Sequence, residues 1–98
     1  MAGKQIIWSD RARNEFNEIL EFFVERNGTP TYSIKLLDQT QNLMNTLSKN
    51  ELIGRLASNK RTRIIPFKEY LIFYEVNDQY INILSFWDNR QEDSGIKI

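Results

Sequence analysis

The chain has 98 residues with 13 basic and 13 acidic side chains, so its formal net charge is zero. Hydrophobic residues make up 41% of it and aromatic residues 12%, which is typical of one folded domain and not of a disordered chain. The absence of cysteine and histidine excludes disulfides and thiolate chemistry and removes the commonest metal ligand, so neither a metal nor another cofactor is expected.

The first part of the chain predicts a strand that leads into a helix. Residues Gln5–Trp8 are apolar and β-branched, as in a strand, and Ser9 follows at the position of a helix N-cap. From Ala12 to Val24 the apolar residues recur with a spacing of i, i+4, i+7 and i+8, which predicts one helix. Asn27-Gly28 is a typical C-terminal stop for it.

A second helix is expected directly after this stop. Thr29 is predicted as its cap and Pro30 as its first residue, where the missing N–H costs nothing. The apolar period then continues to Leu47. Because the connection is so short, the two helices are expected to form an antiparallel hairpin.

The rest of the chain predicts a loop and three strands. Ser48–Lys60 is polar and is interpreted as a loop, and tight turns separate the strands expected at Thr62–Pro66, Glu69–Val76 and Tyr80–Trp87. Residues 92–98 indicate a flexible tail. No apolar run approaches the roughly 18 residues of a membrane span, so a cytoplasmic protein without membrane contact is expected. Residues 1–98 are therefore predicted to form one two-layer α+β domain, ordered β-α-α-β-β-β, with a helical hairpin on one face of an antiparallel sheet.

Side-chain alternation along the strands predicts which residues point away from the helices. Arg61 and Arg63 share one face of their strand, and burying two guanidinium groups under helices would be costly, so this face is expected to point outward. In the last strand Ile81 and Ile83 are expected to point inward. The direction of Trp87 stays open, because a bulge near the end of the strand would reverse it.

A basic and aromatic binding surface is predicted on the outward face. From Lys49 to Glu69 the chain has six basic residues and two acidic ones. Guanidinium groups bind phosphate and aromatic rings stack on bases, so the surface would suit a nucleic acid or an acidic peptide. The residues assigned to it are Arg55, Lys60, Arg61, Trp87 and Asn89. The alternative is that these arginines are solvated charges on an exposed sheet and that Trp87 belongs to the core.

The last strand ends abruptly in Asp88-Asn89-Arg90-Gln91. Asp88 is expected to orient an arginine, Arg63 or Arg90, through a salt bridge. The alternative is a turn in which the side chains of Asp88 and Asn89 accept from local backbone amides.

Three stretches, in this order, resemble the RelE/ParE superfamily of toxins from bacterial type II toxin–antitoxin systems. IIWSDRARNEFNEILEFF is similar to the opening strand and first helix, TRIIPFKEYLIFYEV to the arginine-bearing strand and tyrosine-rich hairpin, and YINILSFWDNRQED to the closing strand. The resemblance covers nearly the whole chain. It implies a growth-inhibiting toxin of a plasmid- or chromosome-stabilising module, neutralised by a cognate antitoxin in a hetero-oligomer.

The resemblance leaves three activities open. One branch of the superfamily poisons DNA gyrase by binding it, which fits a neutral chain without an acid–base set. The other branch is an endoribonuclease that cleaves mRNA on the ribosome without a metal. In that branch Arg63 would bind the scissile phosphate, Arg90 would be a second basic residue and Glu51 the base, unless Glu51 is only a solvated loop acid. The third reading is a non-toxic interaction module that retains the fold.

Overall fold

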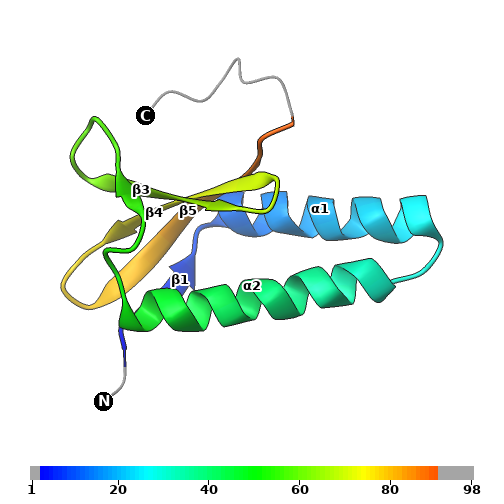
Figure 1. Cartoon of the computed structure of the whole chain (residues 1–98), viewed down its shortest axis with the longest axis horizontal. Helices are drawn as coiled ribbons and strands as arrows, with labels where there is room; N and C mark the ends of the chain where they lie inside the picture. The colour runs from blue at the N-terminus through cyan, green and yellow to red at the C-terminus, as the bar shows by residue number, and fades with distance from the viewer. Residues whose placement is uncertain (1–2, 91–98) are drawn as a thin grey trace.

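Strand β1 (Gln5–Trp8) leads directly into two long helices, α1 (Asp10–Asn27) and α2 (Thr31–Lys49), in the computed structural model of the chain. The strands that follow are β2 (Arg55–Leu56), β3 (Thr62–Phe67), β4 (Tyr70–Val76) and β5 (Tyr80–Asp88). The structure describes residues 3–90, so the tail predicted for residues 92–98 lies outside the described residues. The α+β fold class, with a helical hairpin packed on a sheet, is confirmed (Figure 1). Within residues 3–90, neither helix is apolar enough over a sufficient length to cross a membrane.

The five strands form one sheet in the order β1-β5-β4-β3-β2, and this sheet differs from the expected one in two respects. β1 pairs with β5 in the parallel direction, so the sheet is mixed and not wholly antiparallel. Short turns force antiparallel pairing only between consecutive strands, and almost the whole chain separates β1 from β5. The second difference is β2, which lies in the segment interpreted as a loop. A strand of two residues is too short to give a periodic signal.

The two ends of α1 are confirmed by their caps. The Ser9 hydroxyl accepts a hydrogen bond from the N–H of Ala12 at 3.0 Å. At the other end Gly28 has a left-handed conformation with φ of 71°, and its N–H donates to the Val24 carbonyl at 2.9 Å. A glycine suits this position because a Cβ disfavours positive φ.

Helix α2 begins one residue later than predicted. Pro30 is its N-cap and Thr31 its first residue, while the Thr29 hydroxyl accepts from the N–H of Thr31 at 3.3 Å. The two helices then run side by side, and their connection projects beyond the sheet (Figure 1).

The main core lies between the helices and one face of the sheet. Its helical part consists of Ala12, Phe16, Leu36, Met44 and Leu47. Its strand part includes Ile65, Ile72, Tyr74, Ile81, Ile83 and Phe86. Ile81 and Ile83 are 0% exposed, so their predicted inward direction is confirmed.

The predicted outward direction of Arg63 is wrong. Arg63 is opposite Tyr74 in the sheet register and shares the alternation of Ile65, so it lies on the same face as the main core. The prediction assumed that the helices cover every strand on their side. They lie against β1 and β5, whereas β3 is two strands beyond β5, so the guanidinium of Arg63 is not buried beneath them. Arg61 precedes β3 and is exposed.

A β-bulge decides the direction of Trp87. The register between β4 and β5 shifts so that Leu84 has no partner residue on β4. Beyond it, Phe86 continues the inward face of the strand and is buried in the main core. Trp87 therefore points to the opposite face, where it packs against a second apolar cluster that contains Ile64 and Phe73.

Candidate functional site

Arg63 is bound to the loop that joins α2 to β2. Its Nη1 donates to the carbonyl of Gly54 at 2.8 Å and to that of Leu52 at 3.3 Å. Both acceptors are uncharged, and Arg63 forms no ion pair within residues 3–90. Its half-buried guanidinium therefore stabilises the loop and keeps its positive charge available to a ligand.

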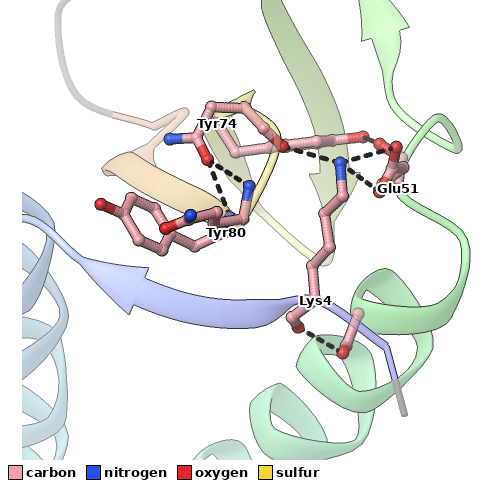
Figure 2. A network of polar contacts seen from close by, with 7 residues as sticks. Lys4, Glu51, Tyr74 and Tyr80 are labelled. Atoms are coloured by element: carbon pink, nitrogen blue, oxygen red, sulfur yellow. Dashed lines mark hydrogen bonds and ion pairs between the residues drawn. The ribbon is translucent and has the colours of Figure 1, made fainter.

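Tyr74 and Glu51 belong to a polar network that holds the same loop (Figure 2). The buried Tyr74 hydroxyl donates to the Glu51 carbonyl and accepts from the N–H of Gly54, both at 2.9 Å. Burial raises the pKa of Tyr74, so this hydroxyl keeps its proton. The Glu51 carboxylate pairs with Lys4 Nζ at 3.0 Å, and Lys4 also donates to the Asn77 carbonyl at 2.7 Å. Glu51 thus joins the loop to the start of β1.

Arg90 lies in a cluster of acidic and aromatic side chains at the end of β5. Its Nε and Nη2 donate to the two carboxylate oxygens of Asp88, each at 3.0 Å, and its Nη1 lies 2.7 Å from Glu69 Oε2. The guanidinium also lies 5.9 Å from the ring centroid of Tyr70 and 6.0 Å from that of Phe23. The predicted salt bridge between Asp88 and an arginine is therefore present, with Arg90 as its partner. The turn contact is present too, because Asp88 Oδ1 accepts from the N–H of Arg90 at 2.9 Å.

This cluster shifts the pKa values of its members. Burial would raise the pKa of the Asp88 carboxyl, but the side-chain and backbone hydrogen bonds from Arg90 outweigh it and lower that pKa. The hydrogen bond to Asp88 raises the pKa of Arg90, and burial raises the pKa of Tyr70 to about 12. The ion pair is therefore charged, and Tyr70 is neutral, at physiological pH.

The three candidate catalytic residues do not meet at one point. Arg63 and the backbone of Glu51 flank Tyr74, whereas the guanidinium of Arg90 lies over Tyr70. Tyr70 and Tyr74 are four residues apart on β4, which corresponds to about 13 Å of strand. The structure brings Arg63 and Glu51 to one loop and places Arg90 at the other end of the sheet.

The β2 edge surface is the name used here for the exposed residues in and around strand β2, and of the predicted binding residues it contains Arg55, Lys60 and Arg61. It consists of Leu52, Ile53, Arg55, Leu56, Lys60 and Arg61, all of them exposed. Leu52 is 63% exposed and Ile53 48%. None of its three basic residues forms an ion pair within the part of the chain that the structure describes.

Its apolar members were not predicted. They lie in a segment without a regular spacing of apolar residues, so the sequence does not indicate that their side chains are exposed. Trp87 and Asn89, assigned to the same surface, lie at and just after the end of β5 and not beside β2. Trp87 packs on the second apolar cluster, and the N–H of Asn89 donates to the Glu69 carbonyl beside Arg90.

A cavity of about 460 Å³ between α1 and the end of β5 was also not predicted. Ile19, Phe23 and Phe86 supply apolar lining. Charges of both signs are present as well, from Arg26 and Arg90 and from the carboxylates of Glu15, Glu18 and Asp88. It forms only where the helix crosses the strand, so no local sequence signal marks it. It places Arg90 beside the aromatic end of the helical hairpin.

Comparison with known proteins identifies a family and similar solved structures. Residues 6–93 match the model of the family described as "ParE toxin of type II toxin-antitoxin system, parDE". No curated protein matches the chain. Among solved structures, the chain is similar to a chain of "Chromosomal ParDE TA system from P. aeruginosa", with a TM-score of 0.74 and 18% sequence identity over 87% of this chain and 95% of that one. At this identity the structural likeness shows the fold alone.

Proposed function

The chain belongs to the ParE toxin family of type II toxin–antitoxin systems, and on this premise we propose that it arrests growth by binding a protein target and not by cleaving RNA. DNA gyrase is the first candidate target. Membership of a toxin–antitoxin system implies an antitoxin as partner, and we propose that the two form a hetero-oligomer in which the toxin is neutralised.

The separation of the candidate catalytic residues is the observation that carries this proposal. Proton transfer during phosphodiester cleavage requires acid and base groups within hydrogen-bond reach of the same reacting atoms. Arg90 is occupied by Asp88 and Glu69, and Glu51 is paired with Lys4. Arg63 and Arg90 lie at opposite ends of the sheet. This arrangement supports binding better than acid–base catalysis.

The β2 edge surface supplies a suitable contact region. Its exposed apolar residues could be buried against a target protein. Its basic residues have no acidic partner within the described chain. An interface with an apolar centre and a charged rim is the common arrangement in protein complexes. We propose that Leu56 and Arg61 contact an acidic and apolar region of the target.

One observation favours the ribonuclease alternative. Arg63 is half-buried and has no carboxylate partner within residues 3–90, as a phosphate-binding arginine requires. On this observation mRNA cleavage is the second candidate function, and Arg63 would be the residue that binds the phosphate.

Inducible expression of the chain alone in bacteria separates these functions. We expect growth arrest with intact mRNA by primer extension, and inhibition of DNA supercoiling when purified protein is added to gyrase. Arg61→Ala is expected to weaken both effects, and Lys35→Ala, which removes an exposed charge on α2, to leave them unchanged. Discrete mRNA cuts that Arg63→Ala abolishes would replace this proposal by the ribonuclease. Absence of arrest would favour the non-toxic interaction module.

A further inference from the structure

The loop between α2 and β2 exposes two large apolar side chains in succession. Leu52 and Ile53 are both exposed, and Leu56, four residues after Leu52, is exposed as well. Neither apolar cluster found within residues 3–90 includes these three side chains. Single exposed apolar residues are common on protein surfaces, but three within five residues form a patch that the packing of the fold does not explain.

The side chain of Tyr74 fixes both ends of this loop (Figure 2). Its buried hydroxyl donates to the carbonyl of Glu51 and accepts from the N–H of Gly54, so one atom joins the residues on either side of Leu52 and Ile53. Glycine is needed at position 54 because a Cβ there would lie 2.7 Å from a ring carbon of Tyr74. The loop therefore rests directly on the ring.

The main chain between these ends is held too. Arg63 Nη1 donates to the carbonyls of Leu52 and Gly54. The N–H of Ile53 donates to the carbonyl of Asn50 at 3.2 Å. Loops on a protein surface are ordinarily more mobile than the elements they join. Here the hydrogen bonds go to the backbone, and the side chains of Leu52 and Ile53 are left to project outward.

The charges near the loop are almost all positive. From Lys49 to Arg61 the sequence has one acidic residue, Glu51, and its carboxylate is neutralised by Lys4 at 3.0 Å. The same segment has four basic residues, none of which forms an ion pair within the described part of the chain: Lys49, Arg55, Lys60 and Arg61. A partner that buries the loop therefore meets apolar side chains surrounded by unpaired positive charge.

We propose that Leu52 and Ile53 are the anchor residues with which the toxin holds its protein target, and that the target offers an apolar depression bordered by carboxylates. A few central side chains supply most of the binding energy of an interface, and side chains on an already ordered loop lose little freedom on binding. The bordering carboxylates complement the four unpaired basic residues. The inference deepens the proposed function and rests on it, because it presumes toxicity by binding.

Leu52→Ala and Ile53→Ala in the full chain test the two anchors. The readouts are growth arrest on inducible expression and inhibition of supercoiling by purified DNA gyrase. Each substitution is expected to raise the toxin concentration that halves supercoiling by about tenfold and to relieve the arrest. Ile34→Ala is the matched control, because Ile34 on α2 is 62% exposed and Leu52 is 63% exposed. It should leave both readouts unchanged, and all three variants should melt within about 3 °C of wild type.

Leu52→Asp and Leu52→Asn test the chemistry of the target. The two variants remove the same apolar side chain and have nearly the same shape, so they differ in charge alone. At low salt Leu52→Asp should be about tenfold less potent than Leu52→Asn, because its carboxylate would face the carboxylates of the target. Equal potency of these two variants would overturn the acidic border.

The remaining outcomes separate this inference from the proposed function. If wild type arrests growth with intact mRNA and both alanine variants arrest it equally well, the anchors are refuted while toxicity by binding stands. If wild type arrests growth without inhibiting gyrase, the target is another protein, and the same variants decide the question through the growth readout. A melting temperature of Leu52→Ala far below that of wild type would show that the side chain serves the fold, and would overturn the inference. Discrete mRNA cuts by wild type would refute the proposed function and this inference together.

Discussion

The carboxylate of Glu15 on α1 accepts a hydrogen bond from the backbone N–H of Phe86 on β5 at 3.0 Å. The same oxygen accepts from the hydroxyl of Ser85 at 2.8 Å. Both donors directly follow Leu84, where the bulge interrupts the pairing of β5 with β4. One helix side chain thus fixes α1 to the sheet at the point where the sheet is least regular.

Glu15→Ala is expected to lower the free energy of unfolding by about 1–3 kcal/mol, because it leaves a part-buried N–H and a hydroxyl without their acceptor. Urea unfolding followed by circular dichroism measures this change. Glu18→Ala is the matched control, since Glu18 is an exposed glutamate on the same helix, and its effect should stay below about 0.5 kcal/mol. Equal effects of the two substitutions would show that the contact does not stabilise the fold.

Tyr74→Phe is expected to loosen the loop between α2 and β2. It removes the donor to the Glu51 carbonyl and the acceptor of the Gly54 N–H, at a cost of about 1–3 kcal/mol. Hydrogen exchange of the Gly54 amide should become faster. Tyr80→Phe is the control, because Tyr80 is a half-buried tyrosine for which no hydroxyl contact is found within the described residues, and it should leave this exchange unchanged.

Arg63→Ala and Arg61→Ala are expected to separate stability from binding. Arg63→Ala loses hydrogen bonds to the Gly54 and Leu52 carbonyls and should destabilise the protein by about 1–2 kcal/mol. Arg61 is exposed, so Arg61→Ala should change stability by less than about 0.5 kcal/mol. Thermal unfolding measured beside the toxicity assay checks both values. An unchanged melting temperature for Arg63→Ala would mean that its loop contacts are not stabilising.

Low pH should destabilise the folded wild-type protein through protonation of Asp88. Its pKa is lower in the folded than in the unfolded chain, so its stabilising effect is complete above the unfolded pKa of about 3.9 and is lost as pH falls through the folded value. Asp88→Asn should therefore remove part of the fall in melting temperature below about pH 4. Asp38→Asn, on an exposed aspartate of α2, is the control. Identical pH profiles of wild type and Asp88→Asn would contradict this assignment.

Local signals predicted the helices and their ends well, since Ser9 and Gly28 act through residues close in sequence. The class of fold followed from these elements and from the apolar periods. The parallel direction of β1 could not be predicted, because no turn constrains strands that are so far apart in the chain. The direction of Trp87 also depended on one unpaired residue, Leu84, which gives no signal in the alternation itself.

The candidate site was less predictable, because its residues act through tertiary contacts. The partners of Arg63 are backbone carbonyls of a loop, and every sequence has such carbonyls. The ion pair between Asp88 and Arg90 was foreseeable, since the two residues are neighbours in the chain.

The lengths of the strands bear on how the free toxin behaves at high concentration. The two edges of the sheet are β1, with 4 residues, and β2, with 2, whereas the inner strands have 6, 7 and 9. Sheets grow into fibrils when a long, flat edge offers its main-chain groups to another molecule. Edges this short give an added strand few hydrogen bonds, so the fold itself opposes amyloid-like polymerisation while the toxin awaits a partner.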